Sequence, residues 1–191
     1  MLKRIILFGA FLLMSACGLY YILPPHAPTF KLTDPYKFGD PHKKKILIFT
    51  SSGGGGHISV SNALIDYLKD EFHLGTSFIF SDVLAKFDPM QKLMGRRVTG
   101  EDWYNQMMKR KWNFLLNIAY KIGSSYYGAR KSKLVKTLKK YLMKHKPDLL
   151  ISVVPIVNDA ILEAAKQLDI PFLLIPTDLD PSMFLQRMKR V

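Results

Sequence analysis

The residues best suited to chemistry stand together in the segment 51–57, which reads SSGGGGH. The four consecutive glycines remove every Cβ, so the backbone can turn sharply and approach a ligand closely. An apolar run before them and a helical pattern after them indicate a turn between a strand and a helix. The start of such a helix has free N–H groups and a partial positive charge, which suit an anion or a polar head group. The segment therefore predicts a ligand-binding turn.

Two titratable residues are candidates for the chemistry at this turn. His57 could take a proton from an attacking hydroxyl, since the start of a helix disfavours the imidazolium ion and keeps the ring neutral and basic. Asp178 follows an apolar run, so we expect it at the carboxyl edge of a sheet, where it could orient His57 or the substrate. The alternatives are a histidine that only hydrogen-bonds a loop and an aspartate that caps a turn.

Common nucleotide and metal motifs do not fit the chain. No Lys-Ser or Lys-Thr pair follows the glycines, so the turn is not a Walker A loop, and it does not match G-x-G-x-x-G. Cys17 is the only cysteine, which excludes an internal disulfide and a cysteine-rich zinc site. We expect no metal centre and no bound cofactor.

Apolar runs alternate with helical patterns after residue 44. We expect strands at 45–50, 76–83, 149–155 and 171–177, and helices at 57–72, within 89–146, and from 158 or 159 to 168. Such alternation predicts a layered parallel sheet with right-handed crossovers, so the expected fold class is α/β and Rossmann-like. We divide the chain into an N-terminal segment (1–23), a proline-rich linker (24–43) and a Rossmann-like domain (44–191).

The N-terminal segment contains nineteen residues without a charge, 5–23, after Lys3 and Arg4. At about 1.5 Å per residue a helix of this length just spans the hydrocarbon core of a bilayer. A retained anchor helix and a cleaved export signal both fit the pattern. The sequence MSAC, which ends at Cys17, also resembles a lipoprotein signal, in which Cys17 would be acylated. The two basic residues keep the N-terminus inside, whereas the lysines at 43–45 favour the opposite orientation more weakly.

The net charge of +13 arises from one region. Residues 92–146 carry fifteen Lys and Arg and only two acids, Glu101 and Asp102. Basic residues mixed with aromatic ones are typical of a helix in a lipid head-group layer. The predicted membrane surface consists of Lys109, Arg110, Lys111, Trp112, Arg130 and Lys131. Nucleic acid fits less well because no recognised binding motif accompanies the charge, and a solvated surface without a partner is the remaining alternative.

Residues 45–63, KILIFTSSGGGGHISVSNA, resemble the opening of monogalactosyldiacylglycerol synthases and bacterial diacylglycerol glucosyltransferases. The similarity continues in KPDLLIS (146–152), IPF (170–172) and TD (177–178). The resemblance implies the GT-B arrangement, in which two Rossmann-like domains face each other across a cleft. The first domain binds the lipid acceptor, and the second binds a UDP-sugar as co-substrate.

The resemblance also implies roles for the turn. His57 matches the family's base, and Ser52, Gly53, Gly54, Gly55 and Gly56 would lie against the acceptor. The implied function is the acceptor side of a hexosyltransferase that transfers sugar from UDP-hexose to diacylglycerol or a similar lipid. Because sugar nucleotides are cytosolic, the cytoplasmic face of a membrane is favoured.

The chain departs from the family pattern at two places. Ile58 stands where a polar residue is usual, and LDPSMF (179–184) replaces a stretch that usually contains His and Trp. No donor domain follows, so we expect this chain to be incomplete unless a separate donor-domain chain joins it. The alternative functions are a non-catalytic, membrane-tethered lipid-binding module and an exported lipoprotein.

Overall fold

The centre of the molecule is a five-stranded sheet with the order β1-β3-β2-β4-β5. The computed structural model describes residues 34–94, 98–179 and 181–188. Its strands are β1 (Tyr36–Phe38), β2 (Lys45–Thr50), β3 (His73–Phe78), β4 (Leu149–Ser152) and β5 (Phe172–Leu174). Strands β2 to β5 run parallel to one another, and β1 pairs with β3 in the antiparallel sense. This arrangement confirms the predicted α/β class with a Rossmann-like parallel sheet.

The central strand β2 is apolar because both faces of the sheet are covered. Ile46 and Ile48 belong to the core cluster that packs against helix α2 (Gly55–Leu68). Leu47 and Phe49 belong to the larger core cluster on the opposite face of the sheet. Successive side chains of a strand point to opposite faces, so a strand buried on both sides reads as one continuous apolar run. The sequence pattern therefore predicted the position of β2 correctly.

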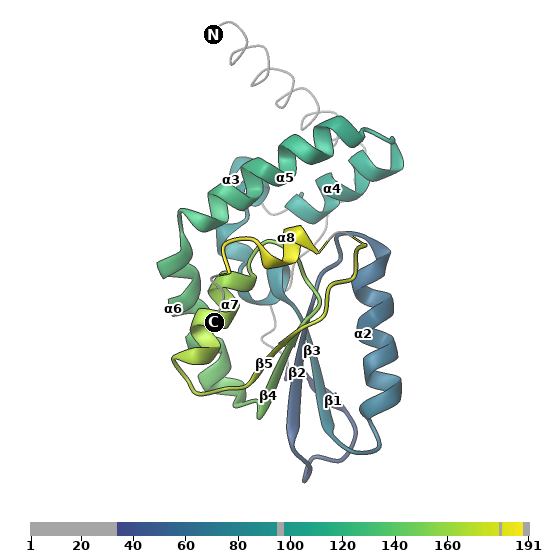
Figure 1. Cartoon of the computed structure of the whole chain (residues 1–191), viewed down its shortest axis with the longest axis vertical. Helices are drawn as coiled ribbons and strands as arrows, with labels where there is room; N and C mark the ends of the chain where they lie inside the picture. The colour runs from purple at the N-terminus through teal and green to yellow at the C-terminus, as the bar shows by residue number, and fades with distance from the viewer. Residues whose placement is uncertain (1–33, 95–97, 180, 189–191) are drawn as a thin grey trace, which may run out of the picture.

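The helices surround this sheet on both faces and at one end. They are α2 (Gly55–Leu68), α3 (Pro89–Met94), α4 (Gly100–Lys109), α5 (Asn113–Gly128), α6 (Lys131–His145), α7 (Asn158–Lys166) and α8 (Ser182–Leu185). Figure 1 shows α2 against one face of the sheet, and α6 and α7 against the other. It also shows α4, α5 and α8 beyond the carboxyl ends of the parallel strands. This end of the sheet is where ligands bind in open α/β folds.

Strand β1 lies inside the segment 24–43, for which the sequence predicted only a linker. Tyr36 is buried in the core, and its ring packs over Gly75 of β3, where an added Cβ would lie 2.9 Å from Tyr36 Cδ1. A three-residue strand that depends on one aromatic ring and one facing glycine leaves no alternating pattern in the sequence.

The predicted strand 76–83 is wrong in its second half. Strand β3 ends at Phe78, and Ile79–Val83 forms a π-helical turn, followed by a short 3₁₀ turn at Ala85–Phe87. The Asp82 carboxylate accepts a hydrogen bond from the Phe78 N–H at 2.7 Å, which closes the chain into this turn. Apolar residues in a buried helical turn resemble those of a buried strand, so the run alone could not separate the two.

The remaining boundaries shift by a few residues. The strands predicted at 149–155 and 171–177 are β4 and β5, which are both shorter, and α2 begins and ends earlier than the predicted helix 57–72. The predicted N-terminal apolar helix and Cys17 lie outside the described residues. Within the described residues, no helix has both the length and the apolar character that crossing a membrane requires.

Candidate functional site

The glycine turn connects β2 to α2 at the carboxyl edge of the sheet. Gly54 has φ 90° and ψ 152°, a conformation that is essentially restricted to glycine. A Cβ on Gly53 would lie 3.3 Å from Ser51 Oγ and 3.6 Å from Tyr104 Cδ1. An added Cβ on Gly55 or Gly56 would meet no atom within 4 Å. Gly54 is thus fixed by its backbone conformation, and a Cβ on Gly53 would crowd Ser51, whereas Gly55 and Gly56 leave open space at the start of α2.

Helix α4 closes over this turn through hydrogen bonds to two of its side chains, Glu101 and Asn105. The Glu101 carboxylate accepts hydrogen bonds from Ser51 Oγ at 2.6 Å and from the Ser52 N–H at 2.8 Å. Asn105 Oδ1 accepts from the Gly54 N–H at 2.9 Å. The free N–H groups expected at the turn are therefore already paired at Ser52 and Gly54.

His57 lies in the first turn of α2, with only 7% of its surface exposed. Its Nδ1 is 2.8 Å from the Thr177 hydroxyl, and its ring lies 6.2 Å from that of Phe184. Burial lowers the pKa of His57 below its ordinary value, although a hydrogen bond to the Val153 backbone and the charge of Asp178 act in the opposite direction. Burial therefore favours the neutral form of the imidazole, which is the form that can accept a proton.

Asp178 lies near His57 but is exposed and forms no hydrogen bond to it; Thr177 makes that contact instead. The Asp178 charge acts through space on the surrounding groups. Burial raises the pKa values of Tyr104 and Tyr120 most, and the negative charge of Asp178 raises both of them further. The structure thus brings the two predicted catalytic residues to one edge of the sheet, together with two tyrosines from α4 and α5.

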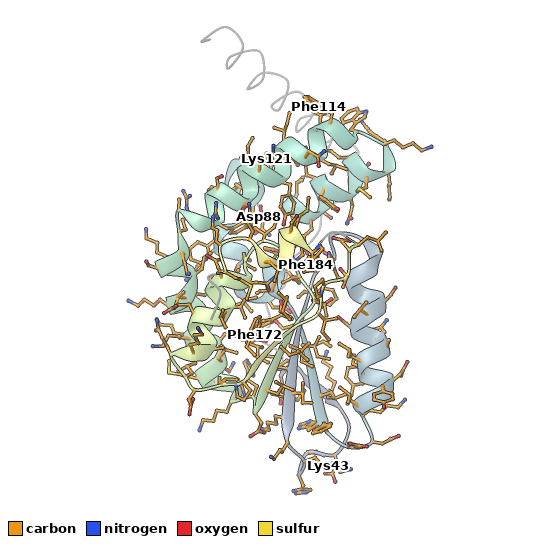
Figure 2. The ribbon with its side chains drawn as sticks, in the orientation of Figure 1. Lys43, Asp88, Phe114, Lys121, Phe172 and Phe184 are labelled. Carbon is orange, nitrogen blue, oxygen red and sulfur yellow. The ribbon has the colours of Figure 1, made fainter. Side chains whose placement is uncertain are left out.

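A buried polar network holds α8 over this edge. Asn158 accepts a hydrogen bond from Ser152 Oγ at 2.7 Å and donates to the carbonyls of Val154 and Phe184. Phe184 is fully buried, and Figure 2 places it beyond the ends of the strands. Asn158 is the first residue of α7, and its buried amide links this helix to β4 and α8, which fixes their relative positions. The network therefore also fixes the position of α8, whose Phe184 ring lies near His57.

The predicted membrane surface separates into two places in the structure. Lys109 ends α4, and the turn to α5 follows with Arg110, Lys111 and Trp112. The Arg110 guanidinium lies 5.2 Å from the centre of the Trp112 ring. Two apolar side chains beside them are exposed, Met108 by 49% and Phe114 by 76%, and Figure 2 labels Phe114 at the upper end of the molecule. We call residues 108–114 the α4–α5 tip.

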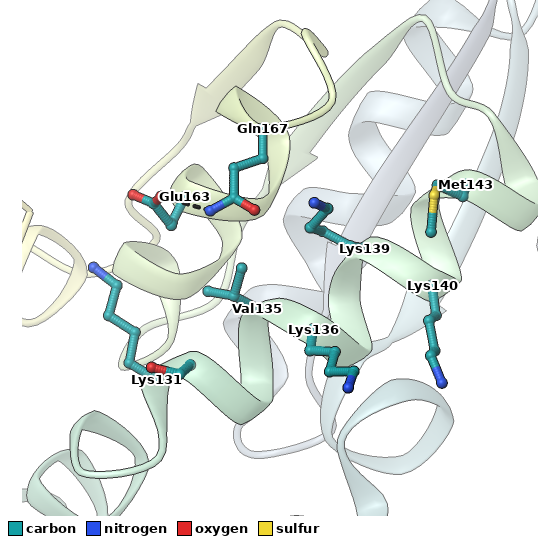
Figure 3. A pocket seen from close by; sticks show the side chains of 9 residues that line it. Lys131, Val135, Lys136, Lys139, Lys140, Met143, Glu163 and Gln167 are labelled. Atoms are coloured by element: carbon teal, nitrogen blue, oxygen red, sulfur yellow. Dashed lines mark hydrogen bonds between the residues drawn. The ribbon is translucent and has the colours of Figure 1, made fainter.

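Arg130 and Lys131 lie at the opposite end of α5 and are engaged within the fold. The Arg130 guanidinium stacks on the Tyr126 ring at 3.7 Å. Lys131 Nζ lies 3.5 Å from the carboxylate of Asp159, which is only 6% exposed. Lys131 also lines a groove of about 580 Å³ between α6 and α7, which Figure 3 shows together with Lys136 and Lys139. The six predicted surface residues therefore do not form one patch.

Three residues of the site were missed at the level of sequence. Glu101 and Asn105 lie on α4, whose sequence gives no sign of a contact with the glycine turn, although Glu101 is one of only two acids in the basic region 92–146. Thr177 was noted only as part of a short matching motif, and 120 residues separate it from the ring that it contacts. Such contacts depend on the tertiary fold, which brings distant loops to one edge of the sheet.

Comparison with known families places the site in context. The family model for monogalactosyldiacylglycerol (MGDG) synthase matches residues 57–188, which begin at His57 and include Asp178. The chain belongs to this family. The match runs from His57, the third residue of α2, to beyond α8, so it includes the helices that close the carboxyl edge of the sheet.

Two relatives of the chain are processive diacylglycerol beta-glucosyltransferases. The one from Staphylococcus haemolyticus (strain JCSC1435) is 28% identical over 142 residues, which is 71% of this chain and 34% of the relative. The one from Staphylococcus aureus (strain JH9) is 29% identical over 144 residues, again 71% and 34%. The chain thus matches about a third of the length of these relatives. No solved structure matches the chain.

Proposed function

We propose that this chain is the acceptor-side domain of a membrane-associated hexosyltransferase in glycolipid biosynthesis. The observation that carries the proposal is the glycine turn with His57, which stands at the ligand-binding edge of the sheet where the family match begins. The acceptor is diacylglycerol or a similar lipid, in accordance with the relatives' descriptions. The donor is UDP-hexose, bound by a second Rossmann-like domain in the GT-B arrangement that the family resemblance implies.

In this proposal His57 acts as the general base. It takes the proton from the acceptor hydroxyl, the oxygen forms a bond to the anomeric carbon of the hexose, and the bond from that carbon to UDP breaks. A neutral ring is required for the first step, and the burial that lowers the pKa of His57 supplies it. Thr177 holds the ring in place through Nδ1, and Asp178 acts on it through its charge.

The α4–α5 tip is the proposed contact with the lipid surface. It combines three consecutive cations with exposed Met108 and Phe114 and with the Trp112 ring. Aromatic and apolar side chains suit the boundary between head groups and acyl chains, and each cation near an anionic leaflet contributes about 1 kcal/mol. The same helix α4 covers the glycine turn, so the tip would hold the proposed acceptor site close to the membrane. Because the donor is cytosolic, the cytoplasmic face is the proposed side.

A second candidate function is a lipid-binding module without catalysis. The burial of His57 favours it, because a ring that is 7% exposed and bonded to Thr177 also fits a histidine that holds the edge of the sheet together. In that case the chain would bind the lipid at the same turn, and a substitution of His57 would change stability instead of chemistry.

The test supplies the full chain with a separately produced donor-side domain and follows labelled hexose from UDP-hexose into lipid. We expect transfer by the unchanged chain and loss of transfer in His57→Ala. His42→Ala, which changes an exposed histidine outside the site, serves as the control and should transfer normally. Undiminished transfer by His57→Ala would reject the assigned base. Lipid binding without transfer in the unchanged chain would support the second candidate.

A further inference from the structure

We propose that α4 is an internal latch on the glycine turn, in which Glu101 and Asn105 occupy the hydrogen-bonding positions that the polar head of the lipid acceptor would take. In this inference, the contacts between α4 and the turn are the closed state of the site. This inference rests on the proposed function, since it takes the ligand of the turn to be a diacylglycerol head group.

The first arm of the latch is Glu101. A single carboxylate oxygen accepts from both Ser51 Oγ and the Ser52 N–H, at 2.6 and 2.8 Å. Two donors converging on one oxygen form a cradle for an electron-rich atom, such as an ester carbonyl, a hydroxyl or an anionic oxygen. The cradle is built by the end of β2 and the turn, whereas the oxygen that fills it comes from a helix fifty residues further along the chain.

The second arm is Asn105, which both accepts and donates. Its Oδ1 accepts from the Gly54 N–H at 2.9 Å, and its Nδ2 donates to the Ser52 carbonyl at 2.9 Å. The free hydroxyl of diacylglycerol can also accept one hydrogen bond and donate another, and its ester carbonyls can accept. The head group and the two side chains therefore compete for the same donors and acceptors on the turn.

The Tyr104 ring completes the closure. Its edge atoms lie 3.6 Å from where a Cβ of Gly53 would be and 3.9 Å from where a Cβ of Gly54 would be. These two glycines lack the side chains that would keep another group away from the backbone, and the space is used by α4 itself. A ligand reaches this part of the turn only after the ring and both arms have moved aside.

Helix α4 has its own support at its first residue, apart from the turn. The Thr99 and Asp102 side chains form a capping box, and the Gly100 N–H donates to the buried carboxylate of Asp88 at 2.8 Å. A helix fixed at its start by these bonds can exchange its side-chain contacts with the turn without losing its own cap. When a binding-competent state is only partly populated, the apparent affinity for the ligand falls by that fraction.

The latch predicts that substitutions of Glu101 and Asn105 increase the affinity for diacylglycerol. If these residues bound the ligand, the same substitutions would decrease it. We measure the affinity of the full chain in detergent micelles for a fluorescent diacylglycerol. Glu101→Gln weakens the latch by removing the negative charge of its acceptor, and the double substitution Glu101→Gln with Asn105→Leu also removes the acceptor and the donor of Asn105, so both should tighten binding by about threefold to tenfold. If Glu101 and Asn105 instead bound the ligand or shaped the turn for it, the same changes would weaken binding.

Glu163→Gln is the matched control, because it makes the same chemical change on α7, where Glu163 accepts from Gln167. Its affinity should equal that of the unchanged chain. Amide exchange at Ser52 and Gly54 without ligand should be slow in the unchanged chain and faster in the double variant, while the exchange of β2 stays the same. Equal or weaker binding by the latch variants, with β2 still protected, would overturn the latch and leave the proposed function standing. Absence of diacylglycerol binding in every protein would contradict the proposed function and remove the ligand that the latch excludes.

Discussion

The Thr177 hydroxyl lies 2.8 Å from Nδ1 of His57, although the two residues are 120 positions apart. The contact joins the start of α2 to the segment after β5 and fixes the orientation of a buried imidazole. Asp178, the neighbouring residue that the sequence favoured, acts on the same ring only through its charge. Thr177 is therefore the side chain that directly positions the candidate base.

Thr177→Val tests this contact. The change keeps the shape of the side chain but removes the hydroxyl, so a buried ring nitrogen loses its partner and the free energy of unfolding should fall by about 1–3 kcal/mol. Thr177→Ser retains the hydroxyl and should lose much less. Urea denaturation measures both, and nitrogen-15 spectra of the imidazole report whether the protonated ring nitrogen changes. Identical spectra for Thr177→Val and the unchanged chain would show that the hydroxyl does not orient the ring.

The stability of the chain should fall as the pH drops below about 6.5, the ordinary pKa of histidine. Burial lowers the pKa values of His57 and His145 in the folded state. The unfolded chain therefore takes up protons first, and stability is lost between the unfolded and the folded pKa values. Urea denaturation from pH 7.5 to 5.5 measures the slope.

The matched variants for this pH series are His57→Gln and His145→Gln, each of which should flatten the slope. Burial also raises the pKa of Asp88, which gives a slope of the opposite sign in more acid solution. Comparing each variant with the unchanged chain cancels the Asp88 contribution. A slope that stays the same in both variants would contradict the assignment to the two histidines.

The glycines of the turn should differ in their tolerance of a side chain. Gly54→Ala places a Cβ on a backbone with φ 90°, so we expect a loss of about 1–3 kcal/mol in the free energy of unfolding. Gly56→Ala is the control, because its Cβ would meet no atom within 4 Å in the first turn of α2. Alanine is also favoured over glycine within a helix, so Gly56→Ala should be neutral or slightly stabilising. Equal losses in both variants would contradict the described turn.

The α4–α5 tip should dominate binding to anionic membranes. Replacing Lys109, Arg110 and Lys111 by glutamine should weaken binding to phosphatidylglycerol vesicles by about tenfold or more, because each cation contributes about 1 kcal/mol at such a surface. The matched control replaces Lys136, Lys139 and Lys140 of the α6–α7 groove by glutamine and should have a smaller effect. Vesicle flotation at two salt concentrations measures both. A larger effect of the α6 variant would place the membrane contact on α6 instead.

Sequence patterns located the buried strands β2 and β4 and the turn, because these features are local. β2 and β4 are continuous apolar runs, and Gly54 stands in a conformation that only glycine adopts readily. The contacts between the turn and the helix that covers it join residues far apart in the sequence. Glu101 meets Ser51 across fifty positions, and this contact depends on how α4 folds back over the sheet. A run of apolar residues also could not show that the chain after Phe78 forms a π-helical turn.

The central claim is that a lipid acceptor binds at the glycine turn between β2 and α2. Photolabelling of the full chain in detergent micelles with a photoreactive diacylglycerol, followed by mass spectrometry of the peptides, tests it most directly. The account predicts label in the segment 51–57 and on α4, with competition by unlabelled diacylglycerol. Competed label that is confined to the groove between α6 and α7, with none at the turn, would contradict it.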